Sequence, residues 1–361
     1  MTRPDPKPRG RVLAFLAGLV ATLLLVAIVA GVGAWMTLYG PGPKARAGQE
    51  TIVILKPGSG VAQIATTLKR AGVIRSDDAF RVAAKLTGSD RRLRAGEYRF
   101  PSGASLNYVI QKMKSGDVVR HFVTVPEGVT SAMAVRILNA EPVLTGEVEV
   151  PPEGSILPET YEVTRGETRA EVLQRMRDAR DEVLAELWAS RQPGLPFETP
   201  EEAVNLAAIV EKETSVPAER PHVAGVYINR LRQGMPLAAD PTIVYGVSKG
   251  EPLGRGIRRS ELDADTPWNT YKRAGLPPHP IANPGRASLA AVLKPMATKD
   301  LFFVADGTGG HVFAETMAEH DRNVVKWRKI EAERKAAAAA KASTPAAKAA
   351  PAPVPAPGAP K

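Results

Sequence analysis

The sequence predicts an α+β protein with a single N-terminal membrane-spanning helix, a small α+β region and a larger mixed α/β domain. Three observations support this fold class. An uncharged apolar run lies near the N-terminus, a strand–turn–helix pattern repeats three times, and long helical segments precede a late hairpin. With 361 residues, of which 44% are hydrophobic, the chain is long enough to build two domains with cores of their own.

The first predicted element is a helix built on the uncharged, apolar run of residues 12–36. About 20 apolar residues in a helix cross a bilayer core of ~30 Å, whereas the apolar part of a cleaved signal peptide has only about 7–15 residues. The length therefore predicts a retained transmembrane helix at residues 12–38. Trp35 and Tyr39 are suited to the far membrane interface.

The charges around this run predict its orientation. Residues 1–11 hold four basic residues and one acidic residue, Asp5; the basic residues are Arg3, Lys7, Arg9 and Arg11. Because segments rich in lysine and arginine stay in the cytoplasm, we expect residues 1–11 inside and the rest of the chain outside. The absence of cysteine fits a periplasm. The predicted location is the bacterial inner membrane, with a single pass and the C-terminal domains in the periplasm.

A small α+β region is predicted at residues 50–140, after a short linker at 39–49. Residues 51–72, 97–116 and 121–140 each run from an alternating strand through a Pro/Gly turn into an amphipathic helix. An extra helix follows Ser76, which is a good N-cap residue, and Gly72 and Gly116 stand where helices end.

A mixed α/β domain is predicted at residues 141–330, where long helices precede a hairpin. The segment 140–158 is rich in Pro and Gly and separates it from the preceding region. Two apolar runs, 301–305 and 311–314, flank the turn DGTGG and predict the hairpin. The Ala/Pro-rich basic segment 331–361 cannot bury a core, so we expect it to be a flexible tail.

The segment TPEEAVNLAAIVEKET, residues 199–214, predicts a helix that ends in two glutamates with opposite directions. Thr199 can cap it, Pro200 suits its first position, and Glu202 completes a capping box with Thr199. At 100° per residue, Glu213 falls at ~280°, inside the arc of the heavy apolar residues. Glu211 falls at ~80°, on a side of the helix with smaller apolar residues. Asn205 and Lys212 share a polar face. Only Glu213 extends the core stripe.

Burial of Glu213 gives it a chemical role. Burial disfavours the carboxylate and raises its pKa above about 4.3, and the negative end of the helix dipole acts in the same direction. A carboxyl that stays protonated near neutral pH is suited to general acid catalysis. The alternative is that Glu213 leans into water or pairs with an arginine such as Arg220 or Arg230.

Composition argues against a metal enzyme and a nucleic-acid-binding protein. The five histidines are scattered, and none has a metal-ligand spacing such as HExxH, so no metal and no cofactor are expected. The net charge of +10 lies largely at the two ends of the chain, and no nucleic-acid recognition motif accompanies it. Solvated tails and attraction to an anionic surface account for this charge better than nucleic acid does.

Four segments resemble the endolytic murein transglycosylases of the MltG (YceG-like) family. They are IVEKETSVPAERPHVAGVYINRLRQGMPLAADPTIVYG, LPETY, TPWNTYKRAGLPPHPIANPG and FFVADGTGGHVF. The resemblance spans about residues 50 to 330, and the region before residue 141 looks like the LysM-like subdomain of that family. The N-terminal anchor agrees with the family's layout, whereas the Ala/Pro-rich tail is an addition.

The resemblance implies a reaction. In the family, the second glutamate of the E-K-E-T motif, here Glu213, is the catalytic acid and base, and Glu211 is a neighbour without a chemical role. Lytic transglycosylases cleave the β-1,4 bond between N-acetylmuramic acid (MurNAc) and N-acetylglucosamine (GlcNAc) without water. They leave a 1,6-anhydroMurNAc end, so a second essential carboxylate is not required. The implied partners are peptidoglycan glycan strands, the inner membrane and penicillin-binding proteins or other cell-wall synthases, with a role in ending strand elongation.

Further residues of the matching motifs are candidates for substrate binding. They could hydrogen-bond the sugar or stabilise oxocarbenium-like charge, and they are Tyr271, Asn269, Asp240, Thr242 and Asn229. These residues also have a structural interpretation. Asp-Pro and Asn-Pro pairs, such as Asp240–Pro241, form turns, and a buried tyrosine such as Tyr271 often only fills a core. For Asn229 and Arg230 the sequence does not separate positioning of the helix from substrate binding.

Two other functions stay open at this point. The first is a non-catalytic peptidoglycan-binding or synthase-scaffolding protein in which the LysM-like region does the work. The second is a hydrolase with two carboxylates, in which Glu213 is the acid and Asp240 is the second group. The products of glycan cleavage separate these possibilities.

Overall fold

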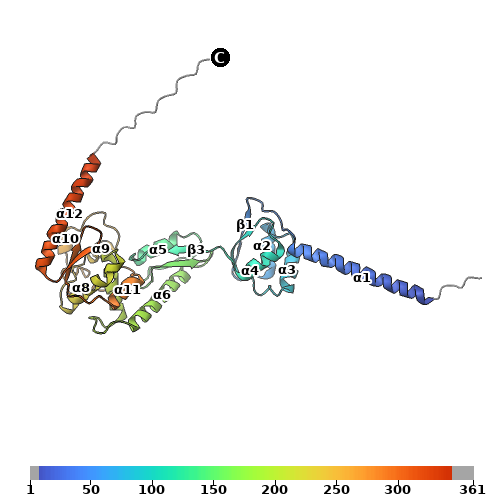
Figure 1. Ribbon diagram of the computed structural model, residues 1–361, viewed down its shortest axis with the longest axis horizontal. Helices are drawn as coiled ribbons and strands as arrows, with labels where there is room; N and C mark the ends of the chain where they lie inside the picture. Colours follow the sequence, from blue (N-terminus) through green and yellow to red (C-terminus); the bar gives the residue numbers. More distant parts are fainter. Residues whose placement is uncertain (1–7, 344–361) are drawn as a thin grey trace, which may run out of the picture. The chain divides into compact units, whose positions relative to one another are not determined.

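A computed structural model of the chain describes residues 8–343 (Figure 1). Residues 1–7 of the predicted cytoplasmic segment and residues 344–361 of the predicted tail lie outside the described residues. The chain forms two compact units. The first contains the residues up to Thr124 together with Ile137–Val148 and Thr160–Val172, and the second contains Val125–Arg136, Glu149–Glu159 and the residues from Leu173 onward.

The predicted N-terminal helix is present as α1 (Pro8–Tyr39), a continuous helix in Figure 1. Its 27 residues from Leu13 to Tyr39 are long and apolar enough to cross a membrane. The end of α1 is attached to the first unit, because Leu38 packs against that unit's core. Two backbone hydrogen bonds, from Gly42 to Gly103 and from Gly103 to Pro43, strengthen the attachment.

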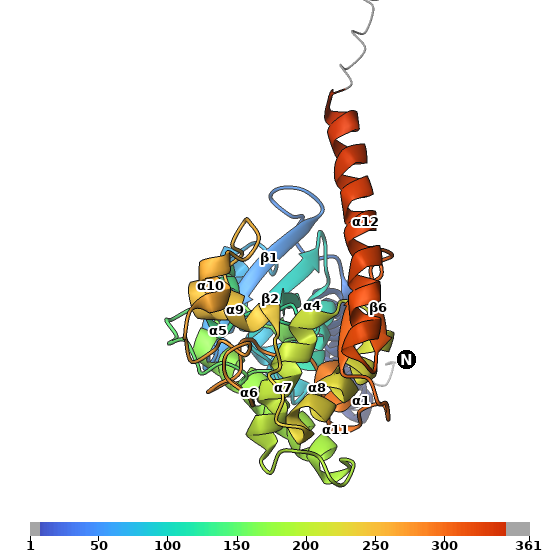
Figure 2. The ribbon, with the colours of Figure 1, turned by 90° about the vertical axis from the view of Figure 1, so that its left-hand side faces the viewer.

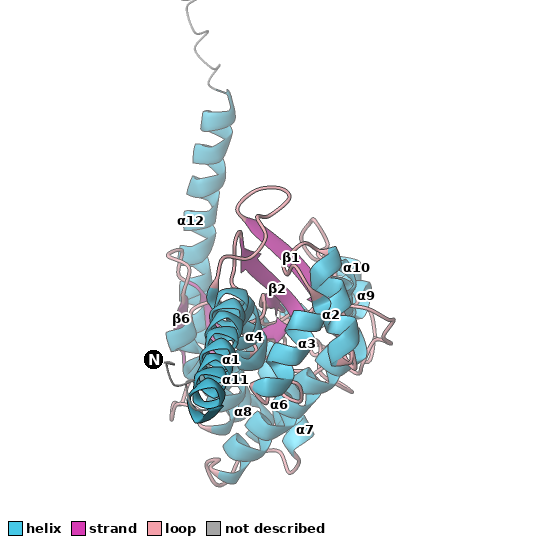
Figure 3. Ribbon diagram, turned by 90° about the vertical axis from the view of Figure 1, so that its right-hand side faces the viewer, coloured by secondary structure: helices cyan, strands magenta, loops and turns pink. Residues whose placement is uncertain are grey.

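The first unit contains a two-stranded antiparallel sheet, β1 (Glu50–Leu55) with β2 (Gly96–Pro101). Three helices accompany it: α2 (Val61–Arg70), α3 (Asp77–Leu86) and α4 (Leu106–Ser115), as Figure 3 shows. The core between them includes the fully buried rings of Phe80, Tyr98 and Phe100. Ser76 caps α3 by accepting from the amide of Ala79 at 3.2 Å, as predicted.

The third strand–turn–helix repeat is also present, as β3 (His121–Thr124) and α5 (Ser131–Ala140). β3 pairs with β4 (Thr160–Val163), which lies beyond the Pro/Gly-rich segment, so the two compact units interleave along the chain. Composition alone placed a single boundary at residue 140. It could not show the interleaving, because a strand's partner is set by tertiary contacts rather than by local composition.

The second unit is mainly helical. Its elements are α6 (Arg169–Ala189), which starts in the first unit, α7 (Pro200–Glu213), the short 3-10 helix η1 (Pro217–Glu219), α8 (Arg220–Arg232), α9 (Asp240–Ser248), α10 (Arg259–Asp263), α11 (Arg286–Leu293), β5 (Phe302–Ala305), β6 (His311–Ala314) and α12 (Met317–Ser343). β5 and β6 form the predicted hairpin, and α12 packs against both strands. Figure 2 shows α12 as a long helix.

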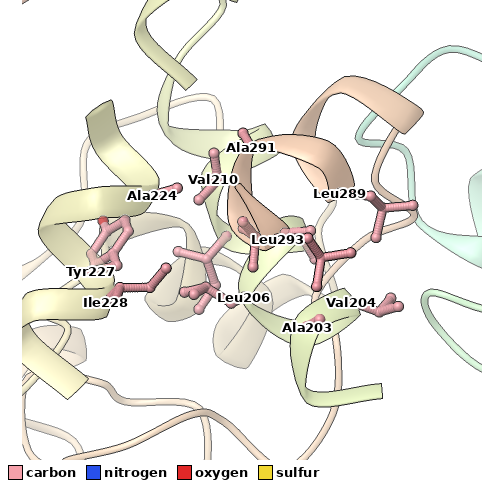
Figure 4. Packing of buried hydrophobic residues seen from close by; sticks show 14 of the residues in the cluster. Ala203, Val204, Leu206, Val210, Ala224, Tyr227, Ile228, Leu289, Ala291 and Leu293 are labelled. Carbon is pink, nitrogen blue, oxygen red and sulfur yellow. The ribbon is translucent and has the colours of Figure 1, made fainter. Parts of the chain in front are cut away.

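Helix α7 lies at the centre of the second unit's core. It packs against α8 and α11, and Figure 4 shows Leu206 and Val210 among residues of these two helices. Every residue from Ala203 to Val210 is buried. The predicted polar face is therefore wrong for Asn205, which is buried and donates from its side-chain amide to the carbonyl of Pro277 at 2.6 Å. A helical wheel shows direction but cannot show that neighbours cover every side of a helix.

Two histidine–carboxylate contacts attach the hairpin β5–β6 and the segment before it to α8 and η1. His222 of α8 lies 2.7 Å from Asp300 and stacks on Phe313 of β6, with ring centroids 3.5 Å apart. Glu219, at the end of η1, lies 2.8 Å from the ring Nδ1 of His311 in β6. These contacts place the hairpin next to the segment that follows the C-terminal end of α7.

Candidate active site

Local sequence signals place Glu213 at the last position of α7. Thr199 and Glu202 form a complete capping box at the start of the helix, with Pro200 in the first turn, as the sequence predicted. The backbone becomes extended at Thr214, which precedes the 3-10 helix beginning at Pro217. The helix thus carries the Glu213 carboxyl out of the core to the wall of two cavities.

The carboxyl of Glu213 has a perturbed pKa. Burial raises the pKa of Glu213 from 4.5 to about 7, and the negative charge of Asp240 acts in the same direction. The hydroxyl of Tyr227 donates to Oε1 of Glu213 at 2.7 Å; this bond and the charge of Arg230 lower the pKa and only partly oppose the burial. At neutral pH a large fraction of Glu213 is therefore protonated and able to donate a proton.

Two cavities meet at Glu213 and Asp240. One, of about 270 Å³, is also lined by Tyr227, Arg230, Tyr271 and His320, among others. The second, of about 580 Å³, is also lined by Lys212, Tyr245 and Arg255, among others. A long polymer could lie across the carboxyl with one part in each cavity, and polar side chains line both parts.

Asp240 and Tyr271 form one hydrogen-bonded pair beside Glu213. The Tyr271 hydroxyl donates to Oδ1 of Asp240 at 2.6 Å, and burial, followed by this contact, raises the pKa of Tyr271, so its hydroxyl keeps its proton. Asp240 is the first residue of α9, and Ala238, two residues earlier, has a positive φ of 51°. Such backbone is uncommon and costly for alanine.

The other three predicted binding residues hydrogen-bond to backbone groups. Thr242 is fully buried; its hydroxyl donates to the carbonyl of Ala239 at 2.7 Å and lies 2.9 Å from the hydroxyl of Thr270. The Asn269 side chain donates to the carbonyls of Leu262 and Ala264 and accepts from the amide of Tyr271. The Asn229 side chain donates to two carbonyls of the segment before β5, those of Thr298 and Asp300. The structure gives each of the three a positioning contact, and none of them lines either cavity.

The sequence assigned no role to the lining residues Tyr227, Phe303 and His320, and for Arg230 it left positioning of the helix and substrate binding open. Tyr227 and Arg230 lie three positions apart on α8, and this spacing puts both side chains on one face of a helix. Phe303 and His320 come from β5 and α12, more than 85 positions along the chain from Glu213. Spacing on α8 could have suggested the first two, whereas nothing local relates the last two to Glu213.

Glu211 points away from Glu213, as predicted, yet it is buried. Its side chain is only 5% exposed, and Oε1 lies 2.9 Å from Nη2 of Arg220. Oε2 accepts from the backbone amide of Gly285 at 3.0 Å. Arg220 therefore pairs with Glu211, while Arg230 donates to the backbone carbonyls of Leu237 and Leu301. The two arginines considered as partners of Glu213 both have other partners.

Within residues 8–343, no group of three or more His, Cys, Asp or Glu side chains is placed to hold a metal ion. The polar groups around Glu213 are instead suited to hydrogen bonding and to proton transfer. A protonated carboxyl with a carboxylate nearby, set between two cavities, can protonate a leaving oxygen and stabilise positive charge beside it.

Comparison with known proteins gives the chain a family. The YceG-like family matches residues 53–326. The endolytic murein transglycosylase of Bacillus subtilis strain 168 is 30% identical over 302 residues, covering 75% of this chain and 82% of that protein. The endolytic murein transglycosylase of Streptococcus pneumoniae strain D39 is 27% identical over 319 residues, covering 74% of this chain but only 57% of that protein. A solved YceG-like protein of Listeria monocytogenes is 26% identical, with a TM-score of 0.47 over 76% of this chain and 99% of that one. The match over most of the chain shows that this protein belongs to the YceG-like family.

Proposed function

We propose that this protein is a membrane-anchored lytic transglycosylase that cleaves MurNAc–GlcNAc β-1,4 bonds inside peptidoglycan glycan strands. The name endolytic murein transglycosylase, carried by its relatives in two bacteria, supports the substrate class. The observation that carries the proposal is the Glu213 carboxyl, whose pKa is raised to about 7 by burial and which stands between two cavities. A site open on both sides of the acid suits cleavage within a strand.

The reaction needs one acid that becomes a base. Protonated Glu213 gives its proton to the glycosidic oxygen as the bond from that oxygen to the MurNAc anomeric carbon breaks, and the GlcNAc part leaves with a free 4-hydroxyl. The Glu213 carboxylate then takes the proton of the MurNAc 6-hydroxyl, while the oxygen of that hydroxyl bonds to the anomeric carbon. The 1,6-anhydro ring closes, Glu213 is protonated again, and no water is consumed. An intramolecular nucleophile gains a large effective concentration.

The neighbours of Glu213 have complementary roles in this scheme. The Tyr227 hydroxyl, 2.7 Å from Oε1, stabilises the carboxylate that forms after the first proton transfer. Asp240 places negative charge near the oxocarbenium-like carbon, and Tyr271 holds Asp240 by its 2.6 Å hydrogen bond. We assign substrate contact to Tyr271 and Asp240. Asn269, Thr242 and Asn229 act through the backbone segments that they hold.

The products of cleavage test the proposal. The full chain in detergent is incubated with glycan strands freed of stem peptides, and the new ends are analysed by mass spectrometry. We expect 1,6-anhydroMurNAc ends, which disappear with Glu213→Gln. Reducing ends, heavier by one water, would instead show a hydrolase with Asp240 as its second carboxylate. Strands that bind but stay uncut would indicate a scaffolding protein, and either result would refute the proposed reaction.

The pH dependence of cleavage is a further prediction. Because Glu213 must be protonated to start the reaction, kcat/KM is expected to fall about tenfold per pH unit above about pH 7. Asp240→Asn removes a charge that raises the pKa of Glu213, so this alkaline limb is expected to move to lower pH. The check is a pH series for both proteins. An unmoved limb would show that another group controls it.

We also propose the predicted arrangement across the envelope. Helix α1 anchors the protein in the inner membrane with residues 1–11 in the cytoplasm, and both compact units lie in the periplasm. The region 50–140 is the LysM-like subdomain, which binds glycan, and the region 141–330 is the catalytic domain; cell-wall synthases are the proposed partners in ending strand elongation. Protease added to spheroplasts is expected to digest nearly the whole chain, and full protection would contradict this orientation.

A further inference from the structure

His320 lines the cavity of about 270 Å³ together with Glu213, although it comes from the distant helix α12. It lies in the first turn of α12, where its amide donates to the carbonyl of Thr316. Its ring stacks on Phe302 of β5, with centroids 5.3 Å apart and planes 26° from parallel. The imidazole is thus held in a fixed place on the cavity wall that faces the α7 carboxyl.

The five histidines differ in their hydrogen bonding. The rings of His121, His222 and His311 each lie within 3.0 Å of a carboxylate oxygen, and the ring of His279 lies 2.7 Å from the carbonyl of Pro280. The Nδ1 atom of His320 is buried and has no hydrogen-bond partner among the described residues. Buried polar atoms without partners are rare in proteins. Among the described residues, Asn205, Arg220, Trp268 and Ser288 each also hold one, but of these five side chains only that of His320 lines the cavity of about 270 Å³ with Glu213.

The charge state of His320 suits an uncharged ligand. Burial, which has the largest effect, lowers the pKa of His320 below 6.5; Arg230 acts in the same direction and Asp321 opposes it. The imidazole is therefore neutral at neutral pH. A neutral imidazole has one donor and one acceptor nitrogen, which match the hydroxyl and acetamido groups of an amino sugar.

We propose that His320 is a further substrate-contacting residue, whose imidazole hydrogen-bonds a hydroxyl or acetamido group of the sugar bound in this cavity. The inference rests on the proposed function. In it, β5 and α12 form the wall that contacts the sugar on one side of the bond to be cleaved. His320 does not exchange a proton in the reaction, because Glu213 carries out both proton transfers. Its contribution is to substrate affinity and orientation.

Two substitutions in the full chain separate this contact from a packing role. His320→Phe keeps an aromatic ring on Phe302 but removes both nitrogens, whereas His320→Asn places an amide near the position of Nδ1. With glycan strands as substrate, we expect His320→Phe to lower kcat/KM about tenfold, mainly through KM, at an unchanged Tm. We expect His320→Asn to recover most of that loss. Val325→Phe, at an exposed position of the same helix that lines neither cavity, is the matched control and is expected to keep the wild-type KM.

Direct binding gives a second measurement. Uncut strands are titrated into Glu213→Gln protein with and without His320→Phe, and the affinity is expected to fall about tenfold in the double variant. Unchanged affinity and KM in a folded His320→Phe protein would overturn the inference. A Tm loss in both His320 variants with equal loss of activity would also overturn it, because it would show a packing role. A wild-type protein that releases no anhydro ends would refute the proposed reaction instead, so the two failures are distinguishable.

Discussion

Glu213→Gln is expected to lower the rate of glycan cleavage by about 10³–10⁴-fold, because no other described side chain can take over both proton transfers. Glutamine has almost the same shape and can still accept the hydrogen bond from Tyr227, which lies 2.7 Å from Oε1. The substitution thus removes the exchangeable proton and leaves the packing. Rates are measured from the release of anhydro ends at pH 6, where wild-type Glu213 is mainly protonated.

The same substitution is expected to stabilise the folded protein above neutral pH. The folded pKa of Glu213, about 7, lies above its ordinary value of 4.5, so the folded state holds a proton that the unfolded state has lost. Stability therefore falls as pH rises from 4.5 to 7, by on the order of 3 kcal/mol, and stays lower above 7. Glutamine removes this loss. At pH 8 its Tm is expected to be several degrees above wild type, and at pH 4 the two should agree.

Glu211→Gln is the matched control, since it makes the same chemical change two residues away. The Glu211 carboxylate is paired with Arg220 at 2.9 Å, so its neutralisation weakens an ion pair and is expected to lower Tm. Cleavage should remain within a few-fold of wild type. Glu213→Gln is thus expected to lose activity and to raise Tm above neutral pH, whereas Glu211→Gln is expected to keep activity and to lower Tm. Equal loss of activity in both would show that position on the helix does not decide the catalytic residue.

The sequence predicted those parts of the fold that depend on local rules. The capping box of Thr199 and Glu202, the Ser76 cap and the hairpin 302–314 each follow from residues close in the chain, and each is present. The pairing of β3 with β4 was not predictable in this way. It joins strands that are 36 residues apart along the chain, from Thr124 to Thr160, across a segment that composition marks as a linker.

For the site, periodicity predicted that Glu213 and not Glu211 extends the apolar stripe of α7, but it did not predict that Glu211 is buried as well or what surrounds either glutamate. The predicted direction of Glu213 agrees with its place on the cavity wall, where Asp240 and Tyr271 join it from the segments after α8. The contributions of Phe303 and His320 depend on how the hairpin and α12 fold back, which a one-dimensional pattern does not contain. Asn269 and Thr242 belong to the same motifs but point into the protein, because a motif records sequence and not side-chain direction.

Arg220→Met is expected to destabilise the second unit by about 3–5 kcal/mol, the largest loss of stability that we predict. Arg220 is 11% exposed and lies 2.9 Å from Glu211 and 3.2 Å from Glu127. Without it, Glu211 would keep only the Gly285 amide, and a buried carboxylate would lack a counter-charge.

Urea denaturation followed by tryptophan fluorescence measures this effect, because Trp188 and Trp268 pack against the core that contains α7. Arg259→Met is the control: its ion pair with Asp263 is exposed, with side chains 87% and 49% accessible, and is expected to contribute at most about 1 kcal/mol to the free energy of unfolding.

Adding Glu211→Gln to Arg220→Met removes the unpaired charge, so the double variant should regain part of the lost stability. If the double variant loses the sum of the two single effects, the pair does not act as a unit. The orientation of α7 and of the Glu213 carboxyl would then depend on apolar packing alone.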